Sequence, residues 1–364
     1  MLWENTMTKK KPEYVKDFEI GIYTLGDYTS NAITNEIVSE QQRIEEIIQA
    51  AVLTEKYGLD VFGVGESHQE HFVSQAHALI LSAIARETSR IKLISSATVL
   101  STSDPVRVYE DFTTLDLLSN GRAEIVAGRA SRIGGFELLG YNLNDYEALF
   151  EEKMDLLKKL NEEKTITWSG KYREPLNNAV LYPKPLNESM PLWRAVGGPA
   201  ESAIKAGIAG VPMILATLGG PASHFKESVD AFRAYAEHYG HDDLPVGITA
   251  LFHVADTPNE ALREFYPYVD HVFRSANGNG FSKQLMAQQV DKRSVMMVGT
   301  VESLIEKILY QYDMFKHQRL LLQLDVGGMS FEEVEKQIKI IGTQIAPAVK
   351  KAIKERQDNE NTGN

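Results

Sequence analysis

The stretch VGESHQEHF, residues 64–72, places two glutamates and two histidines close together. Carboxylate and imidazole side chains serve as metal ligands and also as general acids or bases. His68 and His71 are three residues apart, a spacing that holds a metal only when other strands supply further ligands. The other strand ends offer few such groups, so we expect no metal. Glu66 and His68 then form either an acid–base pair or a buried structural hydrogen bond.

A second candidate site is the segment AVGGPAES, residues 195–202. It ends an apolar run, turns on Gly197 and Gly198, and opens a helical segment. Free backbone amides at a helix start, together with the Ser202 hydroxyl, are suited to bind a phosphate group. The alternative is an ordinary strand-to-helix turn.

A third candidate is Arg129, which follows Gly128 at the end of another apolar run. Gly128 allows close approach of a ligand, and a guanidinium group binds phosphate with two parallel hydrogen bonds. A salt bridge at the edge of the fold explains Arg129 equally well. If the two runs are neighbours, Arg129 and the Gly198 turn share one phosphate.

The elements that position these residues alternate between apolar strands and amphipathic helices. Most strands are nearly continuous apolar runs, as in parallel sheets that are buried on both faces. Eight such units favour a closed (β/α)8 TIM barrel, whose sites lie at the C-terminal ends of the strands. A doubly wound sheet is the alternative, but no G-x-G-x-x-G loop follows the first strand. The expected strands are 18–25, 60–66, 91–100, 122–129, 191–197, 211–217, 245–255 and 319–326.

Helix starts and interruptions divide the chain further. Thr257 and Ser330 are expected caps, each followed three residues later by a glutamate. The segments 163–190 and 271–299 break the alternation, and we expect them to form excursions that build the walls of a site. We expect one domain over 18–355, with a flexible leader at 1–17 and a flexible polar tail at 356–364.

Composition excludes several functions. The net charge of −12 argues against nucleic acid as a partner, because phosphate backbones require clustered Lys and Arg. The absence of cysteine excludes disulfides, thiolate nucleophiles and cysteine-ligated metal sites. No apolar run approaches the length of a membrane span, and the N-terminal residues lack an apolar signal core. We therefore expect a soluble cytoplasmic protein that does not associate with membranes.

Three blocks of this sequence resemble the bacterial luciferase-like family of flavin-dependent monooxygenases. The most specific is 95–129, SSATVLSTSDPVRVYEDFTTLDLLSNGRAEIVAGR. The segment 195–202 resembles the flavin-phosphate turn of the family, and VGESH resembles its Glu-His-His element. The resemblance extends over about residues 18–353.

The resemblance implies reduced FMN as cosubstrate, bound across the C-terminal end of the barrel. It implies that Arg129, Gly198 and Ser202 hold the phosphate, with Gly128 and Gly197 beside them. Ser96 and Thr98 would line the flavin ring, where the family often has a non-proline cis peptide bond. Oxygen would react with the reduced flavin to form a flavin hydroperoxide, which would then oxygenate a small organic substrate. A separate reductase as flavin supplier and a homodimer are implied as well.

One residue departs from the family pattern. Ser67 occupies the position of the first histidine in the family's Glu-His-His element. A serine hydroxyl does not exchange protons near neutral pH as imidazole does, so His68 becomes the candidate proton donor and Glu66 its orienting partner. Three alternatives stay open: a non-catalytic FMN-binding protein, a deazaflavin-dependent dehydrogenase on the same fold, and a barrel metallohydrolase, which would need a bound metal.

Overall fold

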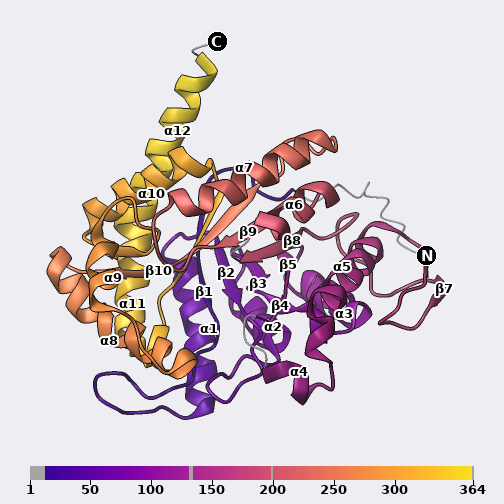
Figure 1. Ribbon diagram of the computed structural model, residues 1–364, viewed down its shortest axis with the longest axis horizontal. Coiled ribbons are helices and arrows are strands. Elements are labelled where there is room, and N and C mark those ends of the chain that lie inside the picture. Colours follow the sequence, from indigo (N-terminus) through magenta and orange to yellow (C-terminus); the bar gives the residue numbers. More distant parts are fainter. Residues whose placement is uncertain (1–12, 131–133, 198–199, 363–364) are drawn as a thin grey trace, which may run out of the picture.

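The computed structural model describes residues 13–130, 134–197 and 200–362, and within them parallel strands close into a barrel (Figure 1). The barrel strands are β1 (Glu19–Thr24), β2 (Val61–Val64), β3 (Lys92–Ser95), β5 (Ala123–Gly128), β8 (Leu192–Gly197), β9 (Met213–Ala216), β10 (Val246–Val254) and β12 (Arg319–Gln323). Each pairs in parallel with the next in this order, and β12 pairs with β1 to close the ring. The expected TIM barrel is confirmed. We call the C-terminal end of its strands the mouth.

Helices surround the barrel, and most of them pack apolar side chains against its strands. They are α1 (Glu40–Lys56), α2 (His77–Glu87), α3 (Pro105–Leu118), α4 (Gly134–Leu138), α5 (Tyr146–Glu162), α6 (Ala200–Ala209), α7 (Ser223–His238), α8 (Pro258–Asn277), α9 (Lys283–Ala287), α10 (Val301–Phe315), α11 (Phe331–Ile340) and α12 (Ala346–Thr362). Thr257 caps α8 and Ser330 caps α11, each accepting a hydrogen bond from a backbone amide three residues later, as expected.

The barrel interior is filled by apolar side chains that point inward from the strands. They form a cluster of their own, separate from the larger cluster between strands and helices. This division follows from the alternation of side chains along a strand, which sends successive residues to opposite faces. The buried members are Tyr23, Val61, Ile94, Val126, Trp193, Ile214 and Leu321.

A buried ion-pair cluster lies at the opposite end of the barrel from the mouth. Arg319, which is fully buried, donates hydrogen bonds to Glu19 at 2.7 Å and to Glu124 at 2.6 Å. Lys92 Nζ lies 2.7 Å from a carboxylate oxygen of Glu19. Tyr14 lies beside this cluster, with its ring 5.4 Å from that of Trp193. The cluster joins the first, third, fourth and last barrel strands.

Both expected excursions contain secondary structure. The first, 163–190, holds the antiparallel strands β6 (Ile166–Trp168) and β7 (Leu176–Ala179). The second, 271–299, begins inside α8 and includes α9 and the strand β11 (Met297–Gly299), which pairs with β10.

The two ends of the chain differ in how much of them is described. Residues 1–12 of the expected leader lie outside the described residues. At the other end, α12 continues as a helix to Thr362, through most of the expected tail, and extends beyond the other helices (Figure 1). In the part of the chain that the structure describes, no helix is both long and apolar enough to cross a membrane.

Candidate active site at the barrel mouth

Glu66 follows β2 at the mouth and connects two strand ends. One carboxylate oxygen lies 2.6 Å from Nε2 of His68. The other accepts a hydrogen bond of 2.7 Å from the backbone amide of Val99, in the short strand β4 (Thr98–Val99). The side chain of Glu66 is only 6% exposed. Because an ionised carboxylate is an acceptor only, the imidazole donates its Nε2 hydrogen to Glu66.

His77 belongs to the same polar group, although nothing in the sequence indicated it. This residue begins α2, and its Nε2 lies 2.8 Å from the hydroxyl of Thr98. Its Nδ1 lies 3.8 Å from Glu66. Burial lowers the pKa of His77, so the imidazole is neutral at neutral pH. His68, Glu66, His77 and Thr98 therefore form one connected group at the ends of β2 and β4.

Small residues line the mouth next to this group. The peptide bond between Ser96 and Ala97 is cis, as the resemblance implied. A methyl group at Gly128 would lie 3.0 Å from Cβ of Ala97 and 3.1 Å from Cβ of Ala195. Ala97 lies in the break between β3 and β4, and Gly128 and Ala195 lie in the neighbouring strands β5 and β8. Ala97 and Ala195 are partly buried and pack against the interior cluster. Together these three residues form a surface of small side chains, which we call the floor of the mouth. Such a surface leaves room for a flat ring to lie on it.

Arg129 leaves the end of β5 and pairs with Glu147 of α5. Its guanidinium group also lies over the rings of Tyr146, at 5.6 Å, and Phe150, at 5.9 Å. The rings fix the direction of the guanidinium, whereas Glu147 is 56% exposed and free to move into solvent. Arg129 is therefore positioned to exchange a solvent-exposed carboxylate for a phosphate.

Ser202 lies in the first turns of α6 and belongs to a network around Arg194. Arg194 Nε donates to the Ser202 hydroxyl at 3.1 Å, and the other guanidinium nitrogens bind both oxygens of Glu151, at 2.9 and 2.6 Å. Burial raises the pKa of Glu151, but the hydrogen bonds and charge of Arg194 outweigh burial and hold it below its ordinary value. Sequence reasoning missed Arg194, although a charged residue inside the apolar run PLWRAVG signals a buried partner.

The Arg129 and Ser202 groups lie close to each other. The guanidinium of Arg194 lies 4.8 Å from the ring of Phe150, the ring that Arg129 also contacts. A hydrogen bond from Lys205 lowers the pKa of Glu201 in α6, and the charge of Arg129 acts in the same direction. The end of β5 and the start of α6 therefore face one common region.

This region fits a phosphate group. Arg129 and Lys205 provide partly exposed cationic groups, whereas Arg194 is buried and held by Glu151. Glu201, 76% exposed, can turn away as Glu147 can. The Ser202 hydroxyl keeps a hydrogen that it can donate. Gly197 is exposed, with open space where a Cβ would be, whereas Gly198 lies outside the described residues.

His71 is exposed, and its backbone carbonyl accepts a hydrogen bond from Tyr28 at 2.7 Å. In residues 13–130, 134–197 and 200–362, no three His, Asp or Glu side chains are grouped to hold an ion. His68 packs near α4. A Cβ added to Gly135 of that helix would lie 3.3 Å from the Cβ of His68.

Comparison with known proteins assigns the chain to a family. The sequence pattern of the luciferase-like monooxygenases matches residues 23–313, so the chain belongs to this family. Among curated relatives, the N-acetyl-S-alkylcysteine monooxygenase of Bacillus subtilis (strain 168) is 24% identical over 305 residues, which is 82% of this chain and 84% of that protein.

Solved structures share the fold. The oxygenating constituent of 3,6-diketocamphane monooxygenase from Pseudomonas putida, in complex with FMN, superposes with a TM-score of 0.74 at 16% identity, over 91% of this chain and 99% of that one. An F420-dependent secondary alcohol dehydrogenase gives a TM-score of 0.70 at 19% identity, over 92% and 99% of the two chains. The fold is therefore common to enzymes with different flavin-type cofactors.

Proposed function

We propose that the protein is a monooxygenase that uses reduced FMN and O2 to oxygenate a small organic substrate. The observation that carries the proposal is the arrangement of the mouth. The Glu66–His68 pair follows β2, and the region that fits a phosphate lies at β5 and α6. In the order of strands around the barrel, the small residues Ala97 and Gly128 lie between the two. A flavin needs these features in this order, because its phosphate and its reactive ring are at opposite ends.

The binding residues hold the two ends of the flavin. Arg129 and the Ser202 hydroxyl bind the phosphate, and Arg194 fixes the orientation of Ser202. Ala97, Gly128 and the residues around them support the ring, with Ser96 and Thr98 at its edge. The bound reduced flavin supplies the electrons that activate O2.

His68 is the residue that handles the proton. Its Nε2 hydrogen is held by Glu66, so Nδ1 is the ring atom that accepts or delivers a proton at the mouth. Glu66 cannot rotate freely, because its other oxygen is fixed by the Val99 amide. The short helix α4 lies against His68 and limits the access of water to it.

Two partners belong to this proposal. A separate reductase supplies the reduced flavin to the chain. A second copy of the chain pairs through α2 and α3, where Leu79, 72% exposed, and Leu117 present apolar surface.

A deazaflavin-dependent dehydrogenase is the second candidate, because the F420-dependent alcohol dehydrogenase shares the fold and Ser67 removes one histidine from the mouth. Such an enzyme transfers hydride and does not consume oxygen. Retained flavin binding without turnover would instead indicate a binding protein.

The test is an anaerobic titration with reduced FMN, followed by rapid mixing with oxygen. We expect saturable binding and a reoxidation of the flavin that differs in rate from that of free reduced FMN. Tight binding with the reoxidation rate of free flavin would favour the binding protein. Binding of F420 in preference to FMN, without oxygen consumption, would favour the dehydrogenase.

A further inference from the structure

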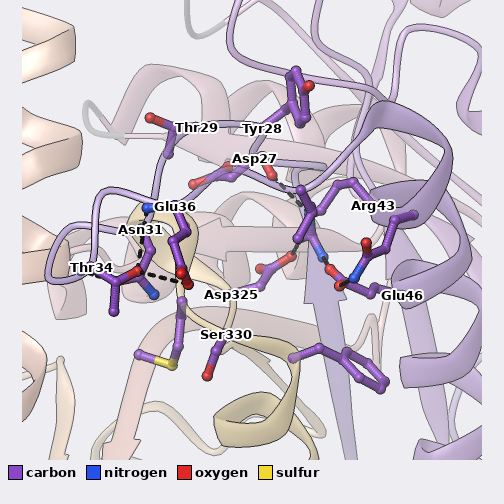
Figure 2. Close-up of a pocket in the computed structure, with 15 residues that line it drawn as sticks. Asp27, Tyr28, Thr29, Asn31, Thr34, Glu36, Arg43, Glu46, Asp325 and Ser330 are labelled. Atoms are coloured by element: carbon purple, nitrogen blue, oxygen red, sulfur yellow. Dashed lines mark hydrogen bonds and ion pairs between the residues drawn. The ribbon is translucent and has the colours of Figure 1, made fainter.

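A second polar cavity lies beside the mouth, outside the flavin region. It has a volume of about 280 Å³. Its walls are the loop after β1, the first turns of α1 and the start of α11. Figure 2 shows the loop residues Asn31, Thr34 and Glu36 on one side, Arg43 and Glu46 on the other, and Asp325 between them.

Four buried charged residues line this cavity, namely Asp27, Arg43, Glu46 and Asp325. Asp325 follows β12 and pairs with Arg43 of α1, and the Thr24 hydroxyl donates to the same carboxylate oxygen, Oδ2. Glu46 lies one turn after Arg43, with a carboxylate oxygen 3.7 Å from the guanidinium. All four residues are at most 9% exposed. Glu46 and Asp325 share one guanidinium, and together with Asp27 they leave a buried excess of negative charge.

One carboxylate oxygen is left without a partner. Asp325 is 7% exposed, and in the described part of the chain its Oδ1 has no hydrogen bond. A buried polar atom without a partner costs about 1–3 kcal/mol, and more when the group is charged. Oδ2, by contrast, receives both Arg43 and Thr24. The unpaired oxygen and the excess charge are independent observations: the first calls for a hydrogen-bond donor, and the second favours a donor that carries positive charge.

We propose that this cavity binds the ammonium group of a small organic cation, with Asp325 and Glu46 as its acceptors. An ammonium group has three hydrogens to donate and a positive charge, which suits the unpaired carboxylate oxygen and the buried excess of negative charge. Val38, Met329 and Phe331 supply apolar surface for the carbon chain of the ligand. The volume limits the ligand to a short alkylamine or a compound of similar size.

Other ligands fit this cavity less well. An anion would meet the buried carboxylates. A divalent metal requires several anionic or carbonyl ligands converging on one point, and the described residues contain no such group of three.

The cavity is separate from the flavin region but connected to its loop. Asp27, in the cavity wall, forms a β-bridge with Phe72, and the Tyr28 amide donates to His71. The loop after β1, which forms one wall of the cavity, is therefore hydrogen-bonded to the loop after Glu66. The ammonium site does not depend on the proposed function, and its test needs no flavin.

The test measures the binding of propylammonium chloride to the full chain by saturation-transfer NMR at constant ionic strength. 1-Propanol serves as the uncharged comparison, and magnesium and calcium chloride as competitors. We expect saturable binding at one site, with no saturation by 1-propanol and no displacement by either metal ion.

The variant Glu46→Gln keeps the size and the contact with Gln42 but removes one charge. We expect it to weaken propylammonium binding by about tenfold or more. Glu45→Gln, on the exposed face of the same helix, is the matched control and leaves binding unchanged. Absence of binding, equal binding of 1-propanol, displacement by Mg²⁺ or Ca²⁺, or unchanged binding by Glu46→Gln would each overturn the proposal. Circular dichroism of both variants verifies that they fold.

Discussion

The carboxylate of Glu66 lies 2.6 Å from Nε2 of His68, and its other oxygen receives the amide of Val99. This arrangement gives Glu66 two fixed partners and, within the described part of the chain, engages only the Nε2 of His68. A residue that only stabilised the strand end would need the amide contact but not the imidazole. The pair can therefore be tested by removing the ring while keeping the carboxylate.

His68→Asn is expected to reduce the rate of oxygenation by about 10²–10⁴-fold, because it removes the group that exchanges the proton. The affinity for reduced FMN is expected to change little, since His68 does not contact the phosphate. Single-turnover kinetics and an anaerobic flavin titration measure the two effects. His71→Asn, at the exposed histidine of the same loop, is the control with normal activity. Full activity of His68→Asn would exclude His68 as the proton donor.

Arg129→Ala is expected to weaken FMN binding by about tenfold or more, because a hydrogen bond to a charged group contributes about 1.5–3 kcal/mol. The affinity for riboflavin, which lacks the phosphate, should stay the same. Fluorescence titration with FMN and with riboflavin measures the two affinities separately. Glu147→Gln is the control, and we expect it to bind FMN as well as the natural chain or better. An equal loss for FMN and riboflavin would show that Arg129 acts elsewhere.

Arg319→Met is expected to lower the free energy of unfolding by about 3–5 kcal/mol, because it leaves Glu19 and Glu124 buried without their main counter-charge. Equilibrium unfolding in urea measures the change. Lys226→Met breaks an exposed pair with Asp230 on α7 and should cost less than about 1 kcal/mol. A similar small cost for both variants would contradict the structural role of Arg319.

The buried ammonium group of Lys307 is expected to make the free energy of unfolding depend on pH. Burial lowers the pKa of this ammonium group from 10.5 to about 7, and its Nζ donates to the Met296 carbonyl at 2.9 Å. Between these two values the unfolded chain holds a proton that the folded chain has released, so stability rises with pH. The rise from this one group is at most about 1.4 kcal/mol per pH unit.

Lys307→Met is expected to remove this rise. The free energy of unfolding of the natural chain, relative to the variant, should therefore increase from pH 7 to pH 10. Urea unfolding at several pH values measures the difference. The control Lys336→Met, at an exposed lysine, should show the same dependence of the free energy of unfolding on pH as the natural chain. A constant difference between the natural chain and Lys307→Met would show that Lys307 has an ordinary pKa.

The sequence predicted the barrel well because buried parallel strands have a simple pattern. The apolar runs 18–25 and 122–129 correspond to β1 and β5, and the caps Thr257 and Ser330 begin α8 and α11. The run 91–100 was predicted as one strand but contains two, β3 and β4. A hydrophobic pattern reports burial and does not report where a strand is interrupted.

The site was predicted less completely because its members meet only in the folded chain. Glu66 and His68 are two residues apart and could be paired from the sequence. His77 contacts Thr98 from a helix start that carries no distinctive pattern. Asp325 and Arg43 are 282 residues apart, so their contact, and the unpaired oxygen beside it, follows only from the closure of the barrel.

The pairing of β1 with β12 has a consequence for the synthesis of the chain. Glu19 and Arg319 are hydrogen-bonded but 300 residues apart, so β1 leaves the ribosome long before its second neighbour exists. Until residues 319–323 emerge, one edge of β1 exposes unpaired backbone groups, and such edges pair readily with other chains. A nascent chain of this protein therefore keeps this edge of β1 open until almost all of the barrel has been made.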